Sequence, residues 1–205
     1  MDPNFFICTD EAWFSLSGSV NSQNSRYYAT HNLHLRNKQP LHSAKLGVWC
    51  AISGRRIITR FFRQTVNADR YIHNLFNPFV EELTEEELLY EYFEQDGATA
   101  HTASRTLSRV HDVLGVNQTV SRGSEICWPS RSPDLSPCAD FYLCGKLKGQ
   151  VYSNTNPQTL EALEANISNA IAALTPEELQ RVFLSLIRRA EICLEASGGH
   201  FENVL

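Results

Sequence analysis

The chain has 205 residues, of which 42% are hydrophobic, so it is long enough to bury the core of one well-packed domain. Lys and Arg number 18 against 23 Asp and Glu, and the formal net charge is −5 at pH 7. Because a basic surface usually supplies most of a protein's affinity for DNA, this balance argues against autonomous high-affinity DNA binding.

Secreted and membrane-spanning classes are disfavoured as well. The start Met1-Asp2-Pro3 is not that of a signal peptide, and no apolar run approaches the roughly 20 residues of a membrane span. The 6 cysteines lack the close pairs of a structural zinc site, so we expect reduced, small apolar side chains. These features predict an intracellular protein that does not engage a membrane.

The first half of the chain predicts three strands and a helix. Aromatic and β-branched residues indicate a strand over residues 4–16. Two further strands are expected over residues 45–52 and 56–62, and the short turn between them is typical of a hairpin. Apolar residues spaced by four predict a helix over residues 68–83, with Asn67 as its N-cap.

The middle of the chain is predicted to alternate between strand and helix. The acidic residues between 81 and 87 are expected to form a solvated surface. A strand is expected over residues 88–95, followed by a helix over residues 102–114. Residues 126–128 are predicted as a short strand that leads into a Pro-rich connection.

The last third predicts two amphipathic helices joined by a short loop. The first has an apolar stripe over residues 160–174, and the second opens with Thr175-Pro176-Glu177-Glu178, a capping box with Pro at the first helical position. Two such helices are expected to form a helical hairpin. The order of all elements favours an α/β domain in which helices pack on a mixed sheet.

Acidic residues follow apolar runs at three distant places in the chain. Asp10 and Asp96 each come at the end of an apolar run, and Asp134 and Asp140 lie in the third such segment. A carboxylate at a strand end is rarely needed for packing, whereas Mg²⁺ requires a few hard oxygen ligands. We therefore expect a divalent-metal site and, from it, a metal-dependent nucleic-acid phosphoryl transferase.

Four segments resemble the mariner-like transposases of the DDE/D superfamily, whose catalytic domain is RNase H-like. Thr9–Phe14 is similar to the segment of their first carboxylate, and Gln95–His101 to that of their second. Trp128–Pro137 is similar to the phrase that introduces the third, and Asp140–Lys148 continues it. The resemblance implies that residues 1–205 are one catalytic domain, with residues 156–205 as its C-terminal helical extension.

The sequence departs from the family pattern in three respects. We expect the two N-terminal helix-turn-helix modules of the family to be absent, which would fit the acidic charge. The family position of the third carboxylate is Ala139, and the pattern Phe141-Tyr142-Leu143-x-Gly145 favours Asp140 over Asp134. A Trp common in that pattern is Cys144 here, which reduces packing bulk.

The resemblance also implies a two-metal mechanism on DNA. Asp10 would bridge two Mg²⁺ or Mn²⁺ ions, and Asp96 and Asp140 would each complete the site of one ion. The reactions would be hydrolytic nicking at transposon ends and attack of a 3′-hydroxyl on target DNA. A homodimer that acts on paired ends in the nucleus is expected on the same grounds.

Several assignments remain open at this point. Glu11 is an alternative to Asp10, and Asp96 before Gly97 is also compatible with a plain turn. We expect His101 to contact a metal ligand rather than the metal itself. Three basic residues near the third carboxylate could contact DNA phosphates or form solvated surface: Arg131, Lys146 and Lys148.

Two other functions compete with a transposase. A catalytically inactive transposon relic, or a host-recruited domain that serves as a protein-interaction module, is favoured by Ala139 and Cys144. A nuclease unrelated to transposition would share the fold and the metal site. Nicking without strand joining would identify the nuclease.

Overall fold

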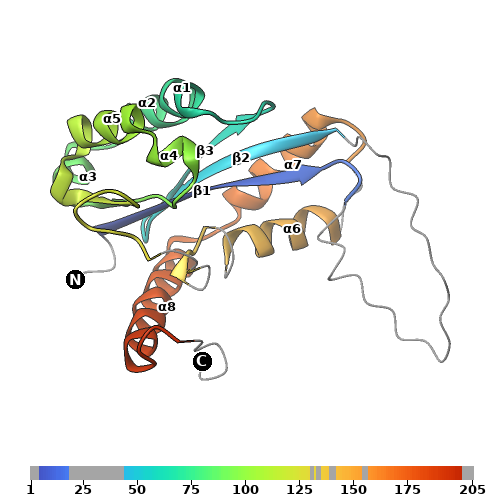
Figure 1. Ribbon diagram of the computed structural model, residues 1–205. Coiled ribbons are helices and arrows are strands. Elements are labelled where there is room, and N and C mark those ends of the chain that lie inside the picture. Colours follow the sequence, from blue (N-terminus) through green and yellow to red (C-terminus); the bar gives the residue numbers. More distant parts are fainter. Residues whose placement is uncertain are drawn as a thin grey trace, which may run out of the picture.

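A five-stranded mixed sheet forms the centre of the molecule (Figure 1). The computed structural model describes residues 5–18, 44–129, 132, 135–138, 142–153 and 157–199. The strands lie in the order β3-β2-β1-β4-β5, with β1–β2 and β2–β3 antiparallel and β1–β4 and β4–β5 parallel. Their bounds are β1 Phe6–Ser15, β2 Lys45–Ile52, β3 Ile57–Phe62, β4 Tyr92–Glu94 and β5 Thr119–Val120. The predicted mixed sheet is confirmed.

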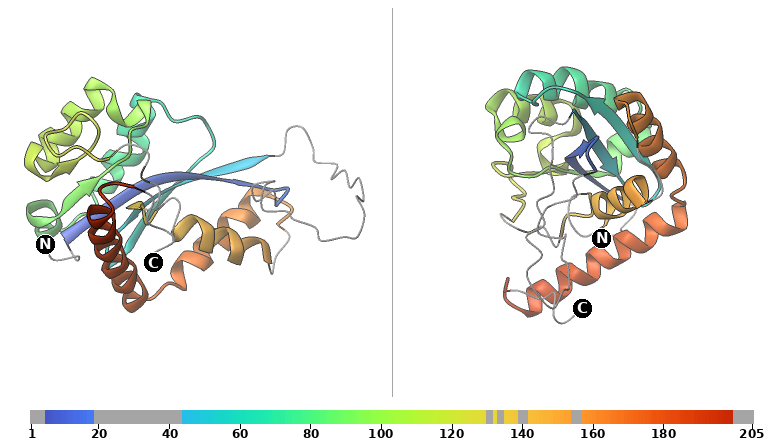
Figure 2. Two further views of the ribbon diagram at one scale, coloured as in Figure 1. Left: turned by 60° about the horizontal axis from the view of Figure 1, so that its bottom comes forward. Right: turned by 90° about the vertical axis from the view of Figure 1, so that its right-hand side faces the viewer.

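Helices cover both faces of this sheet. Figure 1 shows α1, α2, α4 and α5 on one side and α6 and α8 on the other, and the right-hand view of Figure 2 shows the same division. The bounds are α1 Ala68–Arg70, π-helix η3 Tyr71–Phe76, α2 Asn77–Val80, α3 Glu85–Tyr90, α4 Thr99–Thr102, α5 Ser104–Leu114, 3-10 helix η4 Val116–Gln118, α6 Leu143–Ser153, α7 Leu160–Ala172 and α8 Pro176–Glu195. None of the helices in the described ranges is long and apolar enough to cross a membrane.

Alternation along the strands divides the core between the two faces. Ile7 and Phe93 join a buried cluster with Tyr71 and Phe79 of the first helical segment. Phe14 lies an odd number of residues from Ile7 on β1, so its side chain points to the opposite face. There it packs with Leu163 of α7 and with residues of α6. Successive residues of a strand point to opposite faces, so one strand supplies both clusters.

The helix predicted over residues 68–83 is confirmed, and its observed form is a contiguous run of α1, η3 and α2. The side chain of Asn67 accepts a hydrogen bond of 3.0 Å from the backbone N–H of Arg70, as the N-cap prediction requires. The run ends at Val80 rather than at residue 83.

The strand predicted over residues 88–95 is wrong in its first half. Residues 85–90 form helix α3, and only Tyr92–Glu94 are a strand. The Thr84 hydroxyl accepts from the Glu87 N–H at 3.2 Å, and the Glu87 carboxylate accepts from the Thr84 N–H at 2.8 Å. This reciprocal capping box starts a helix where apolar residues alone indicate a strand.

The acidic run is also not the uniform solvated surface that was predicted. Glu87 of this run is buried, with 5% of its surface exposed, and so is Glu91, which follows the run, with 3%. Glu87 accepts a hydrogen bond of 2.9 Å from Arg56 Nε on the β2–β3 side of the sheet. The charge pair, together with the capping box, holds this carboxylate inside.

Smaller differences occur at the sheet edge and at the last helix. Residues 126–128 form no strand, and Ile126 makes only an isolated bridge to Val120 of the unpredicted strand β5. Thr175 caps α8 by accepting from the Glu178 N–H at 3.3 Å, while the Glu178 carboxylate pairs with Lys146. Both C-terminal helices are present, and their buried residues enter different clusters.

Candidate metal-binding site

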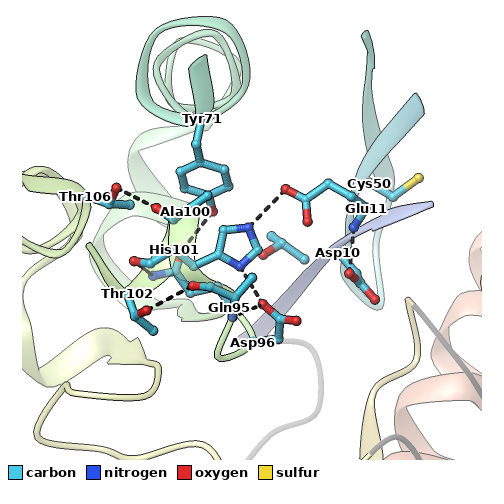
Figure 3. A network of polar contacts seen from close by, with 12 residues as sticks. Asp10, Glu11, Cys50, Tyr71, Gln95, Asp96, Ala100, His101, Thr102 and Thr106 are labelled. Atoms are coloured by element: carbon cyan, nitrogen blue, oxygen red, sulfur yellow. Dashed lines mark hydrogen bonds and ion pairs between the residues drawn. The ribbon is translucent and has the colours of Figure 1, made fainter. Parts of the chain in front are cut away.

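Two of the predicted site carboxylates come from neighbouring parallel strands, Asp10 from within β1 and Asp96 from just after β4. Strands β1 and β4 are parallel neighbours, and Cys8 is the register partner of Glu94. Asp10 comes two residues after Cys8, and Asp96 comes two residues after Glu94. Because the strands run parallel, both carboxylates lie beyond the same end of that register pair. The fold therefore brings together two carboxylates that are 86 positions apart in the chain, as the close-up of Figure 3 shows.

Asp10 is a half-buried residue in the middle of β1. Its Oδ1 accepts a hydrogen bond of 2.6 Å from the backbone N–H of Glu11. Burial raises the pKa of Asp10 to about 7, and the negative charges of Glu11 and Asp96 act in the same direction. No cation among the described residues forms an ion pair with this carboxylate, which is the situation that a bound cation relieves.

Asp96 is fixed by two donors on a single oxygen. Its Oδ1 accepts from the backbone N–H of Ala98 at 2.9 Å and lies 2.6 Å from Nδ1 of His101. Although burial opposes it, the hydrogen bond from His101 lowers the pKa of Asp96 below its ordinary value. Asp96 is therefore ionised at neutral pH, and its other oxygen takes no part in this pair of contacts.

His101 connects Asp96 to Glu11. Its Nε2 lies 3.0 Å from Oε1 of Glu11, and only 1% of the side chain is exposed. Burial alone would lower the pKa of His101, but the hydrogen bonds to Asp96 and Glu11 raise it to about 10. Both ring nitrogens therefore carry protons, so the imidazolium offers no lone pair to a metal and instead orients a candidate ligand.

A buried polar network holds His101 in place (Figure 3). The ring of Tyr71 lies 4.5 Å from the ring of His101, and the Tyr71 hydroxyl donates to Gln95 Oε1 at 2.8 Å. The amide of Gln95 donates to the His101 carbonyl and to the Ser121 hydroxyl, both at 3.2 Å. The helical segment of Tyr71 thus braces the turn that carries Asp96.

Sequence reasoning missed parts of this arrangement. Tyr71 was assigned only to an apolar helix stripe, and Gln95 only to a motif. Their joint role depends on contacts between residues 24 apart, for which the sequence carries no local signal. Glu11 was weighed as a metal ligand, and the structure shows it as the acceptor for His101.

Glu94 is a further carboxylate that the sequence did not single out. Only 1% of its surface is exposed, and its Oε1 has no hydrogen-bond partner within the described part of the chain. Burial, followed by the charges of Asp10 and Asp96, raises the pKa of Glu94 well above its ordinary value. Its position in the short strand β4 resembles that of a core residue, which is why no sequence pattern identified it.

The predicted third carboxylate, Asp140, lies outside the described residues. The same holds for its alternative, Asp134, and for Arg131. The segment before it is described at Cys138, which is buried and whose Sγ lies 2.9 Å from the carbonyl oxygen of Cys8. Cys138 thus lies against strand β1, at the residue two positions before Asp10.

The two predicted DNA-contacting lysines of α6 differ in their surroundings. Lys146 forms an ion pair with Glu178 of α8. Lys148 lies with its Nζ 5.9 Å from the ring centroid of Phe14. Of these two lysines, only Lys146 has a carboxylate partner among the ion pairs of the described residues.

The donor set at the strand ends suits a hard divalent cation. Asp10, Asp96 and the unpartnered oxygen of Glu94 are all carboxylate oxygens, the ligands that Mg²⁺ and Mn²⁺ prefer. As the side chains stand, no three His, Cys, Asp or Glu residues among those described form a group that could hold a metal ion. The described residues supply part of such a site and leave at least one ligand to be identified.

Comparison with solved structures finds a mariner transposase. The Mos1 transposase paired-end complex with the left transposon end matches with a TM-score of 0.76 at 20% identity, covering 98% of this chain and 57% of that chain. The Mos1 catalytic domain with Raltegravir and Mn gives 0.71 at 19%, covering 97% and 86%. The catalytic domain of Mos1 mariner transposase gives 0.69 at 20%, covering 97% and 85%. No protein-family model and no curated protein matches the sequence.

These matches establish the fold. The chain has the RNase H-like fold of the Mos1 catalytic domain over nearly its whole length, which confirms the fold expected from the sequence motifs. It spans 57% of the Mos1 chain in the paired-end complex.

Proposed function

We propose that this chain is the catalytic core of a mariner-like transposase, which cleaves and joins DNA strands with the help of divalent metal ions. The observation that carries the proposal is the pair Asp10 and Asp96, carried by the neighbouring parallel strands β1 and β4 of an RNase H-like sheet. The motifs around both residues support it independently. Solved Mos1 structures with Mn and with Mg make the same metals reasonable here.

In this proposal Asp10, Asp96 and Asp140 hold two Mg²⁺ or Mn²⁺ ions. When bound, such ions activate the attacking water or 3′-hydroxyl and stabilise the leaving oxygen. The protein's own contribution is to fix the ligands: His101 holds one oxygen of Asp96, and Glu11 holds the far side of His101. DNA ends and target DNA are the proposed partners, with a homodimer as the active form and the nucleus as its location.

A non-catalytic interaction domain is the second candidate. The observation in its favour is that the described side chains do not form a three-ligand metal group. In that case Asp10 and Asp96 would be remnants of a site that no longer binds metal. A nuclease without joining activity is a variant of the first candidate.

Plasmid cleavage tests the proposal directly. Supercoiled plasmid is incubated with the purified chain and Mn²⁺, with Asp10→Asn and Asp96→Asn beside the wild type and Asp112→Asn, an exposed residue of α5, as matched control. We expect Mn²⁺-dependent nicking that falls at least about 100-fold in the two site variants and persists in the control. Absence of nicking by the wild type would favour the interaction domain.

Strand joining separates a transposase from a nuclease. A short duplex with a free 3′-hydroxyl is supplied together with the plasmid. Covalent transfer of the duplex into the plasmid supports the transposase, and nicking without transfer identifies a nuclease.

A further inference from the structure

Glu94 lies on the same face of the sheet as Asp10. It is the register partner of Cys8, and Asp10 follows Cys8 by two residues on the same strand. Side chains two positions apart on a strand share a face, and register partners on neighbouring strands do so as well. Cys8 packs with Cys138 and with Phe183 of α8, which identifies that face.

The burial of Glu94 is only partly compensated in the described part of the chain: the Cys8 side chain hydrogen-bonds to its carboxylate, and His101 is a favourable charged neighbour. Its side chain is 1% exposed, yet Oε1 has no hydrogen-bond partner there, and its strongest charged neighbours are the like charges of Asp10 and Asp96. A buried polar atom without a partner is destabilising, and an apolar side chain would fill this position at less cost. A buried carboxylate oxygen without a partner, beside two candidate ligands, therefore points to a ligand that is yet to bind.

The sequence supplies a reason why an additional carboxylate is needed. The motif that introduces the third ligand places it at Ala139, which has no oxygen in its side chain. Cys138, one residue earlier, donates through Sγ to the Cys8 carbonyl at 2.9 Å. Cys138 thus lies against β1 at Cys8, the register partner of Glu94.

We propose that Glu94 is a ligand of the divalent-metal site and supplies the carboxylate that position 139 lacks. The inference rests on the proposed function, because it concerns the same metal. In the described geometry the three carboxylates do not yet form a ligand group, so the Glu94 side chain has to turn about its methylene torsions toward Asp10 and Asp96.

Calorimetric titration of the full chain with Mn²⁺ tests this assignment. We expect Glu94→Gln to weaken Mn²⁺ binding at least about tenfold, since Gln keeps the volume and loses the charge. Asp140→Asn and Asp134→Asn are measured in parallel to determine whether either residue also contributes. Affinity within about twofold of wild type in Glu94→Gln, in a folded protein, overturns the proposal.

Two further measurements keep the outcome clear. The Mn²⁺-induced rise in melting temperature should shrink in Glu94→Gln, and Glu94→Leu replaces it if the Gln variant does not fold. Asp10→Asn serves as the reference for a lost ligand. Wild-type binding that is lost in Asp10→Asn but kept in Glu94→Gln refutes only this inference, whereas absence of Mn²⁺ binding by the wild type refutes the metal site itself.

Discussion

His101 is the residue on which the geometry of Asp96 depends. It separates two carboxylates that would otherwise repel each other, and both of its nitrogens are engaged at 2.6 Å and 3.0 Å. Loss of the imidazolium leaves Asp96 held only by the Ala98 N–H and leaves the half-buried Glu11 without this partner. A change at this one position should therefore affect both metal binding and folding.

We expect His101→Gln to weaken Mn²⁺ binding about 10- to 100-fold, as loss of a residue that orients a ligand does. The free energy of unfolding should fall by about 2 kcal/mol, because two partly buried carboxylates lose a charged donor. Calorimetry and urea denaturation measure the two effects. His73→Gln, at an exposed position of η3, is the control, and wild-type Mn²⁺ affinity in His101→Gln would contradict the positioning role.

Glu91 should make the stability of the fold depend on pH. Its carboxylate has no hydrogen-bond partner among the described residues, and its one ion pair, with Arg55 Nη1, spans 3.7 Å. Burial, together with the charge of Glu87, raises the pKa of Glu91 to about 7 from an ordinary value of 4.5. The folded state thus binds the proton more tightly than the unfolded chain does.

The sign of the effect follows from that difference. Protonation of Glu91 stabilises the fold fully below about pH 4.5, and this contribution is lost as the pH rises through about 7. Glu91→Gln should remove this decline and raise the free energy of unfolding at pH 8 by about 1–2 kcal/mol. Urea denaturation from pH 5 to 8 measures it, with exposed Glu85→Gln as control. An unchanged pH profile in Glu91→Gln would count against the buried charge.

At the scale of elements, strand β2 contains a glycine that the neighbouring strand requires. Gly47 is the register partner of Phe62 on β3, and a Cβ at Gly47 would lie 2.2 Å from the Phe62 ring. That ring also packs edge-on against Trp13 of β1, with centroids 5.0 Å apart. The glycine therefore lets an aromatic side chain cover the sheet.

Gly47→Ala should displace the Phe62 ring and lower the free energy of unfolding by about 1–3 kcal/mol. Gly149→Ala in α6 is the matched control, because a Cβ there has no neighbour within 4 Å and alanine favours the helix. We expect the control to raise stability by about 0.5–1 kcal/mol. Denaturant titration measures both, and equal effects would contradict the close approach of Phe62.

The elements differ in how well the sequence predicts them. The hairpin of β2 and β3 and the long helices α7 and α8 were predictable, because each shows a regular apolar period over many residues. Helix α3 was missed although its capping box, Thr84 and Glu87, is visible in the sequence, since the acidic run obscured it. Strand β5 has only two residues, too few for any period to be read.

The site was predictable only in part for a similar reason. Asp10 and Asp96 could be selected because each follows an apolar run, and parallel pairing then brings them together. The support from Tyr71 and Gln95, and the burial of Glu94, depend on which residues meet in three dimensions. Such contacts leave no periodic or local trace in the chain.

For the molecule as a whole, internal ion pairs occupy many of the basic side chains. Arg55, Arg56, Arg60, Arg63, Arg105, Lys146 and Arg188 all have carboxylate partners. The net charge of −5 adds an excess of carboxylates, which repel phosphates. Binding of duplex DNA by this chain alone should therefore be weak, with a dissociation constant above about 1 µM at physiological salt.

Lys146 allows this argument to be tested with a single charge. Its amine is held by Glu178 in the first turn of α8, and the neighbouring Glu177 is exposed and does not pair with it. Glu178→Gln and Glu177→Gln remove the same charge, but only the first releases Lys146. If Lys146 can reach a phosphate, Glu178→Gln should bind a fluorescent duplex more tightly than Glu177→Gln, and its log–log salt dependence should steepen by about 1. Equal anisotropy titrations for the two variants would mean that Lys146 belongs to the α6–α8 contact and not to a DNA surface.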